Sequence, residues 1–432
     1  MAQARFLSSR PLGRAVLPSV DAVVARVRPA EPLLCLRPGA IAAAAHRFVD
    51  SFPGNVLYAV KCNPDQRVLR ALWAGGVRHF DCASLAEVRL VRKLLPAAEI
   101  HFMHPVKARP AIHEAFHQYA VTDFALDSTD ELAKILQETV PVGLVGDPPT
   151  LGLFVRLALP KGDAVLDLSG KFGASIEEVV ELLRAARPHA ARLGISFHVG
   201  SQCLEPGAYA RAIALAGEAI ARSGVGVDIV DVGGGFPVSY PEMTPPAVGD
   251  YIAAITTASV ALPTTVHLWA EPGRALVAGG GSIVSQVQLR RGDTLFVNDG
   301  VYGSLSDAGA LGFRFPARRI RLGEACLVAF SFAQTGLKGF AVIAIYAARK
   351  IARSHPDQSV RSAVFEGYRH GRSAGWLPGA DWEALLAEPV EAIRAQFRVK
   401  PPTYYRAVLT AMRSLKGKAN AGYADPSIQP SS

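Results

Sequence analysis

The stretch Val56-Leu-Tyr-Ala-Val-Lys61-Cys-Asn-Pro64 places one lysine at the carboxyl end of an apolar run. A short apolar run that ends in turn residues is typical of a buried strand. In a barrel of parallel strands, the carboxyl ends of the strands form the active-site face. Partial burial there lowers the pKa of a lysine, so that its neutral amine can attack an aldehyde. An isolated lysine at a strand end more often only reaches solvent, so this interpretation needs support from other segments.

Around this stretch, short apolar runs alternate with amphipathic segments whose apolar residues recur at i, i+3 and i+4. The expected strands are Val56–Val60, His79–Cys82, Glu99–Met103, Phe124–Leu126, Leu151–Leu157, Ile195–Val199, Val227–Val232 and Thr265–Ala270. Two of the expected helices are Ile176–Ala186 and Tyr209–Arg222. Alternation of this kind favours parallel strands with covering helices, and eight units are the number in a closed (β/α)8 barrel. We therefore expect a TIM-like barrel over residues 33–278.

The pattern changes after residue 278. Strand-like runs occur at Ser282–Arg290, Thr294–Val297, Arg318–Arg321 and Leu327–Phe332, which predicts a partial β domain over residues 279–333. Residues 334–432 favour helices and form a divergent basic tail, and residues 1–32 form an N-terminal segment that is a candidate for the β domain. The predicted fold class is thus α/β: a barrel, a partial β domain and a helix-rich C-terminal tail.

Composition narrows the class of protein. No run approaches the roughly 18 to 20 apolar residues that cross a bilayer, so we expect no membrane partner. The tail carries 14 Lys or Arg against 7 Asp or Glu, and so holds +7 of the net charge of +9. The nearly neutral remainder, without interleaved basic and aromatic residues, argues against a nucleic-acid partner. The five cysteines are scattered, with no metal-ligand spacing, which indicates reduced thiols, a cytoplasmic location and no metal.

Two segments carry groups suited to a phosphorylated, ring-containing ligand. Asp231-Val-Gly-Gly-Gly235 runs from a strand into three glycines, which let backbone N–H groups face an anion such as phosphate. A tight turn between strand and helix would have the same sequence. Glu271-Pro-Gly273-Arg274 offers a guanidinium that can clamp phosphate and a carboxylate that can keep a pyridine nitrogen protonated. On the surface the same two charges would only form an ion pair.

Other polar residues stand at expected strand ends. His198-Val-Gly-Ser201 offers an imidazole and a hydroxyl, and Asp81 and Arg156 close two further strands. Taken alone, each is more often an ordinary core or rim residue than a catalytic one. Their shared position at the carboxyl ends of strands is what makes them candidates.

Together, these segments resemble the ornithine, diaminopimelate and arginine decarboxylases, whose barrel is of the alanine-racemase type (fold-type III), and the ornithine branch is the most similar. The matching segments, in order, are Tyr58-Ala-Val-Lys61-Cys-Asn63, Phe80-Asp81-Cys-Ala-Ser84, Ser169-Gly-Lys171-Phe-Gly173, His198-Val-Gly-Ser201, Asp231-Val-Gly-Gly-Gly235-Phe-Pro237, Glu271-Pro-Gly-Arg274 and Asn298-Asp299-Gly-Val-Tyr-Gly-Ser304. They span roughly residues 33 to 333.

The resemblance implies a pyridoxal 5′-phosphate cofactor bound through a Schiff base on Lys61. It also implies that His198 stacks against the pyridine ring, that Glu271 pairs with the ring nitrogen, and that Lys61, His198 and Glu271 are the catalytic residues. Ser201, Gly235 and Arg274 are expected to hold the phosphate. The whole cofactor-binding set implied is Lys61, Asp81, Arg156, His198, Ser201, Gly234, Gly235, Glu271, Gly273 and Arg274.

The implied reaction is decarboxylation of a basic α-amino acid, ornithine or lysine first, to a diamine of polyamine synthesis by a homodimer. The resemblance ends near residue 333, and no cysteine follows Cys326, so the family's C-terminal Cys-Asp segment has no counterpart. One alternative is therefore a non-catalytic homologue or regulatory subunit that binds pyridoxal phosphate. A third interpretation is an amino-acid racemase with the same barrel.

Overall fold

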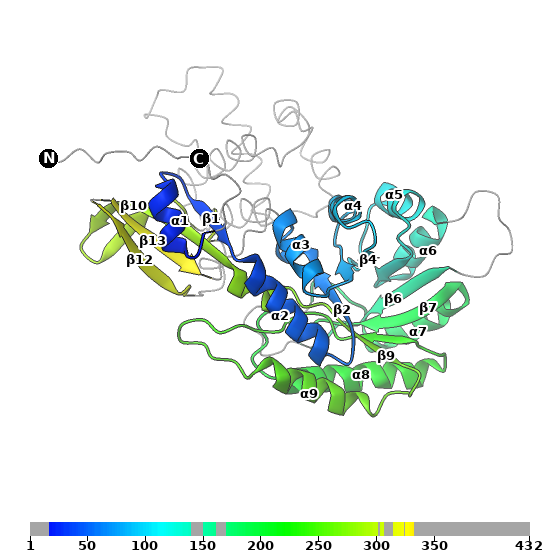
Figure 1. Ribbon diagram of the computed structural model, residues 1–432. Coiled ribbons are helices and arrows are strands. Elements are labelled where there is room, and N and C mark those ends of the chain that lie inside the picture. The colour runs from blue at the N-terminus through cyan, green and yellow to red at the C-terminus, as the bar shows by residue number, and fades with distance from the viewer. Residues whose placement is uncertain are drawn as a thin grey trace, which may run out of the picture. The chain divides into compact units, whose positions relative to one another are not determined.

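A closed barrel of eight parallel strands forms the larger part of the described chain (Figure 1). The computed structural model describes residues 17–139, 150–160, 170–300, 303–305, 314–323 and 325–331. The strands are β2 (Gly54–Ala59), β3 (His79–Asp81), β4 (Glu99–Phe102), β5 (Asp123–Leu126), β6 (Leu151–Arg156), β7 (Ala190–Ser196), β8 (Ile229–Asp231) and β9 (His267–Ala270). Because β2 pairs with both β3 and β9, the sheet has no free edge. The predicted barrel and its eight strands are confirmed, although β7 begins five residues before its predicted start.

Helices cover the outside of the barrel between successive strands (Figure 1). They are α2 (Pro38–Ser51), α3 (Gln66–Ala74), α4 (Leu85–Leu94), α5 (Arg109–Tyr119), α6 (Thr129–Glu138), α7 (Ile176–Ala186), α8 (Gly207–Ser223) and α9 (Val248–Ser259). Ser84, Ser128 and Ser175 begin three of these helices, each accepting a hydrogen bond from a backbone N–H three residues on. Such caps satisfy donors that the first helical turn leaves free.

The barrel has one core inside the strands and another between strands and helices. The inner core is Leu57, Met103, Ala125, Phe154, Ile229 and Trp269. An added Cβ at Gly194 would lie 2.4 Å from Phe154 Cδ1, so this glycine makes room for the phenyl ring. Each fully buried side chain of this size contributes roughly 1.5 to 3 kcal/mol. The filled interior leaves the strand ends as the places where a ligand can bind.

A five-stranded antiparallel sheet accompanies the barrel. Its strands are β1 (Leu33–Leu36), β10 (Gly281–Arg291), β11 (Thr294–Val297), β12 (Ala317–Leu322) and β13 (Ala325–Ser331). The pairing of β1 with β10 makes β1 a strand of this sheet, and α1 (Val20–Val27) packs on it through Val24. The predicted partial β domain is thus present, whereas Ser169 and the tail from residue 334 lie outside the described residues.

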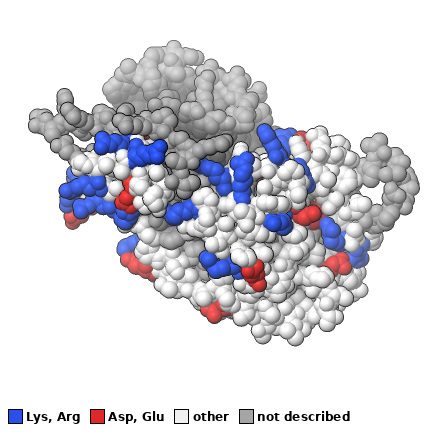
Figure 2. Space-filling view, in the orientation of Figure 1, with Lys and Arg blue, Asp and Glu red and all other residues white. Residues whose placement is uncertain are grey.

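Positive charge gathers over the antiparallel sheet, while the visible barrel surface carries scattered charges of both signs (Figure 2). The exposed arginines of these strands are Arg290, Arg291, Arg318, Arg319 and Arg321. Within the described ranges, no helix is both long and apolar enough to cross a membrane.

A chain of polar side chains crosses the amino-terminal end of the barrel, opposite the predicted active site. His79 Nδ1 lies 3.0 Å from His101 Nε2, and His101 Nδ1 lies 2.6 Å from Asp123 Oδ2. Arg192 donates to the other oxygen of Asp123 at 2.6 Å. Burial, and then His101, lower the pKa of His79 to about 4. His79 is therefore neutral in the folded protein at pH 6, where part of the unfolded chain's imidazole is protonated.

This network predicts a loss of stability on acidification. The pKa of His79 is depressed by folding, so the unfolded chain binds more protons between pH 6.5 and about 4. We expect the free energy of unfolding to fall over that range, by up to about 1.4 kcal/mol per pH unit from this group. His79→Gln should flatten the slope in urea titrations, and the exposed-site control His46→Gln should not. Parallel pH profiles for wild type and His79→Gln would contradict the assignment.

Candidate active site

Lys61 lies at the carboxyl rim of the barrel. It is the middle residue of the 3-10 turn η1 (Val60–Cys62), which directly follows β2. Its Nζ donates to Oδ2 of Asp81 at 2.7 Å, and Asp81, the last residue of β3, is fully buried. The side chain of Lys61 is 47% exposed and lines a cavity at this rim. Asp81 therefore anchors an amine that remains accessible from the cavity.

The charge state of Lys61 differs from the sequence prediction. Burial alone would lower the pKa of Lys61, but the carboxylates of Asp81 and Glu271 outweigh burial and raise it above the ordinary value for lysine. The predicted lowering was wrong because Asp81 is 20 residues away and no local pattern shows its contact with the amine. Lys61 is thus an ammonium whose proton lies in a hydrogen bond to a carboxylate.

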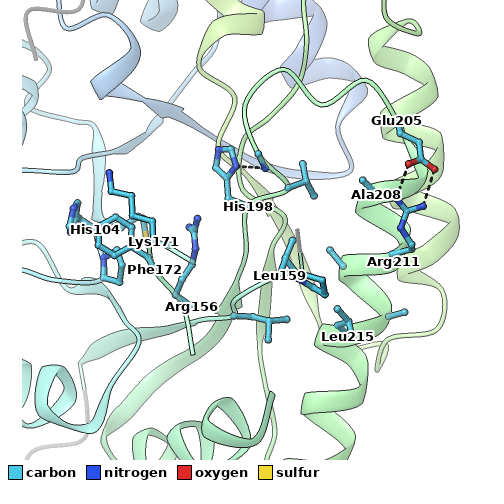
Figure 3. A pocket seen from close by; sticks show the side chains of 18 of the residues that line it. His104, Arg156, Leu159, Lys171, Phe172, His198, Glu205, Ala208, Arg211 and Leu215 are labelled. Carbon is cyan, nitrogen blue, oxygen red and sulfur yellow. Dashed lines mark hydrogen bonds and ion pairs between the residues drawn. The ribbon is translucent and has the colours of Figure 1, made fainter. Parts of the chain in front are cut away.

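The cavity has a volume of about 970 Å³, and Lys61, Arg156 and His198 line it. Arg156 ends β6, and His198 follows β7. In Figure 3, Arg156 and Lys171 lie on one side of His198, and the ion pair between Glu205 and Arg211 lies on the other. A cavity of this size accommodates a cofactor together with a small substrate.

His198 presents a neutral ring. Its Nδ1 accepts a hydrogen bond from the backbone N–H of Gly200 at 3.0 Å, so the ring proton is on Nε2 (Figure 3). Burial, followed by the positive charges of Arg156 and Lys61, holds the pKa of His198 well below 6.5. A neutral imidazole is suited to stacking on a flat aromatic group.

Glycines bring the loops after β7, β8 and β9 together. Gly235 has φ +108°, and an added Cβ there would lie 2.5 Å from the carbonyl oxygen of Gly200, the residue before Ser201. At Gly234, an added Cβ would lie 2.8 Å from the carbonyl oxygen of Glu271 and 3.0 Å from His198 Nε2. Only glycine at these two positions leaves the loops in contact. The phosphate that the Gly triplet is predicted to face stays a prediction.

The loop after β9 completes the rim. Glu271 is 3% exposed, and Arg274, the first residue of α10 (Arg274–Val277), donates to the hydroxyl of Tyr240 at 2.6 Å. An added Cβ at Gly273 would lie 2.9 Å from Cys62 Cβ, so this glycine lets the loop reach the turn that holds Lys61. The predicted site residues therefore come from strand ends and loops at one end of the barrel, with Lys61, Arg156 and His198 on the cavity wall and the carboxylates of Asp81 and Glu271 buried.

Two residues of this region, Asp231 and Tyr240, were not among the predicted site residues. Asp231, the last residue of β8, is fully buried. Its position just before the Gly triplet was the sequence signal that could have marked it as a site residue. Tyr240 had no local signal, because its partner Arg274 is 34 residues away.

The donors and acceptors at this rim fit pyridoxal 5′-phosphate. A lysine suits its aldehyde, glycine loops suit its phosphate, and a flat neutral imidazole suits its ring. Glu271 Oε1 is buried and has no hydrogen-bond partner within the described part of the chain, so it can accept a hydrogen bond from the N–H of a protonated pyridine ring. The fold and the site together define a pyridoxal-binding (β/α)8 barrel.

Comparison with known proteins identifies the family. The family described as "Pyridoxal-dependent decarboxylase, pyridoxal binding domain" matches residues 39–278, more than half of the chain. The chain belongs to this family, whose cofactor is pyridoxal phosphate.

Named relatives and solved structures agree with this assignment. The chain is 32% identical over 263 residues to the lysine/ornithine decarboxylase of Selenomonas ruminantium, covering 58% of this chain and 64% of that protein. It is 31% identical to ornithine decarboxylase of Mus musculus, with 58% and 57% covered. The structure of lysine/ornithine decarboxylase from Vibrio vulnificus complexed with putrescine gives a TM-score of 0.63 at 28% identity, covering 74% and 94%. The chain thus spans between half and two thirds of the length of its curated relatives.

The glycine loop gives a direct test of the cofactor site. Gly235→Ala forces a side chain into a left-handed conformation 2.5 Å from the carbonyl oxygen of Gly200. We expect the dissociation constant for pyridoxal phosphate, measured by fluorescence titration, to rise at least roughly tenfold, which corresponds to about 1.4 kcal/mol. Gly224→Ala is the control, because Gly224 also has positive φ but its Cβ would meet open space. Equal affinities for the two variants would exclude the loop from the site.

Proposed function

We propose that the chain is a pyridoxal phosphate-dependent decarboxylase of a basic α-amino acid, ornithine or lysine first, and that the product is a diamine of polyamine synthesis. The observation that carries this proposal is the Lys61–Asp81 pair at the cavity, with the buried carboxylate of Glu271 close enough to raise the pKa of Lys61. The names of the relatives, which are lysine/ornithine and ornithine decarboxylases, support the substrate class. The scattered thiols support a cytoplasmic location.

Each rim residue has a proposed role toward the cofactor. Lys61 would hold the aldehyde carbon covalently, His198 would cover the ring, and Glu271 would accept a hydrogen bond from the protonated ring nitrogen. The remaining residues proposed to bind the cofactor are Asp81 and Arg156 on the pocket wall, and Ser201, Gly234, Gly235, Gly273 and Arg274 around the phosphate.

The bound cofactor would supply an electron sink for the bond that is broken when carbon dioxide leaves. The chain's own groups control protons and orientation. Asp81 Oδ2, 2.7 Å from Lys61 Nζ, holds the amine at the cavity and so fixes its position toward the aldehyde of the cofactor. Burial, followed by the positive charges of Arg156 and Lys61, lowers the pKa of His198 and keeps it neutral, so its ring does not repel a protonated pyridine.

An assay panel tests the proposal. Purified full-length protein with added pyridoxal phosphate should release carbon dioxide from ornithine or lysine, and less from arginine and diaminopimelate. Lys61→Ala should release none. Chiral analysis of the recovered amino acid tests racemisation in the same samples. If the protein binds the cofactor but releases carbon dioxide from none of the four, the decarboxylase proposal fails.

The homodimer of the family is also a proposal for this chain. Sedimentation velocity of the cofactor-loaded protein tests it, and a single species at the 45.8 kDa of one chain would contradict it.

A further inference from the structure

Two buried carboxyl groups meet behind the glycine loop. Asp231 ends β8 with no exposed surface, and Glu271 follows the neighbouring strand β9 with 3% exposed. Gly233 links them: its backbone N–H donates to Asp231 Oδ1 at 2.8 Å, and its carbonyl oxygen accepts from the backbone N–H of Glu271 at 2.8 Å. The two carboxyl groups lie close enough for each to shift the pKa of the other. The backbone thus holds two acids together in the interior.

Each acid leaves one oxygen without a donor. In the described part of the chain, Asp231 Oδ2 and Glu271 Oε1 are both buried and lack a partner that donates a hydrogen. A buried polar atom without a partner costs about 1 to 3 kcal/mol, and more when it is charged. Two adjacent anions would add Coulomb repulsion in a medium of low dielectric constant. A single proton between the two acids removes both costs.

The charges of the surrounding residues also indicate one proton on the pair. Asp231 and Glu271 share their surroundings with a third buried carboxylate, Asp81, and with two cations, Lys61 and Arg156. Three carboxylates against two cations leave one negative charge in excess, which one proton cancels. Burial, and then neighbouring carboxylates, raise the pKa of Glu271; burial and Asp81 raise the pKa of Asp231 to about 6. The nearby imidazole of His198 is neutral and does not alter the balance.

We propose that Asp231 and Glu271 share one proton, and that Asp231 is a positioning residue that fixes one oxygen of Glu271 so that the other faces the pyridine nitrogen. The proposal rests on the proposed function for the role of Glu271. With a protonated ring bound, the shared proton belongs to Asp231, whose O–H donates a hydrogen bond to the anionic Glu271. The pair then keeps Glu271 oriented in both states.

The competing explanation is that Asp231 only caps the turn at Gly233. Asp231→Asn separates the two, because asparagine keeps the oxygen that accepts from Gly233 and can donate N–H to Glu271, but cannot be a carboxylic acid. Asp231→Leu keeps neither interaction. Asp293→Asn is the control, since the side chain of Asp293 is fully exposed in a turn.

Infrared spectroscopy of the full-length protein tests the shared proton without any need for turnover. Between pH 6 and 7, wild type and Asp293→Asn should show the carbonyl band of a protonated carboxyl group, with and without pyridoxal phosphate. Asp231→Asn and Glu271→Gln should each lose it. Absence of the band from wild type, or its persistence in Asp231→Asn, overturns the shared proton even if the protein decarboxylates ornithine.

Kinetics of the loaded enzyme test the positioning role. We expect Asp231→Asn to keep kcat within about tenfold of wild type, and Asp231→Leu to lower it at least about a hundredfold with little change in KM. Equal kcat values for the two variants overturn the positioning role. If Asp231→Leu does not fold, the infrared result still tests the shared proton and the kcat of Asp231→Asn still tests the positioning role. A more than hundredfold loss of kcat in Asp231→Asn would show that a hydrogen bond donated to Glu271 is not enough to position it, and would overturn that role. If the protein decarboxylates none of the amino acids, the proposed function is wrong, but the infrared test of the shared proton still stands.

Discussion

Replacing Lys61 by alanine is expected to abolish covalent attachment of pyridoxal phosphate and to lower kcat/KM at least roughly a thousandfold, about 4 kcal/mol of lost transition-state stabilisation. The reason is that Lys61 Nζ is the amine fixed at the cavity by Asp81, at 2.7 Å. Borohydride reduction followed by mass spectrometry of peptides measures the attachment, which should be found on Lys61 in wild type and be absent from the variant.

A control separates this effect from a general loss of positive charge. Lys93 lies on the exposed side of α4, so Lys93→Ala should leave both attachment and kcat/KM near the wild-type values. Lys61→Arg keeps the charge opposite Asp81 but cannot form the covalent bond. If Lys61→Arg were labelled by borohydride at another lysine with kcat unchanged, Lys61 would not be the attachment site.

The barrel could be predicted because each strand is a local pattern. Runs such as Val56–Val60 are buried on both faces, so they are continuously apolar and easy to recognise. β7 was the exception, since the exposed Arg192 interrupts its apolar run in order to reach Asp123 at the barrel end. The membership of β1 in the second sheet could not be seen locally, because its partner β10 begins about 250 residues later.

The candidate site could be predicted only as far as its motifs. The motifs stand at the carboxyl ends of strands, and in a barrel these ends lie together at one face. This places Lys61, His198, Glu271 and the glycines near one another. The electrostatics depend on distances between loops, and these reversed the predicted shift in the pKa of Lys61. Asp231 was quoted with the Gly triplet but not predicted as a site residue for the same reason, since its significance comes from Glu271, 40 residues later.

Glu271→Gln is the second change with a large expected effect. Glutamine has nearly the same shape but cannot carry the negative charge that keeps a pyridine nitrogen protonated, so the electron sink is weaker. We expect kcat to fall roughly 10² to 10³-fold, about 2.7 to 4 kcal/mol, with a smaller change in KM. Steady-state rates of carbon dioxide release measure this effect. Glu177→Gln is the matched control, because Glu177 forms an exposed ion pair with Arg222 and does not line the cavity.

The same variant should be more stable than wild type in the cofactor-free protein. Burial, and then Asp231 and Asp81, raise the pKa of Glu271 in the folded state above its ordinary value of 4.5. The unfolded chain therefore binds fewer protons than the folded protein above pH 4.5, and this group makes stability fall as pH rises. Glu271→Gln removes that dependence, so its unfolding temperature should exceed that of wild type at pH 8, and by less at pH 5. A variant that lost activity and was also less stable at pH 8 would indicate that Glu271 holds the fold together rather than serving the ring nitrogen at a cost in stability.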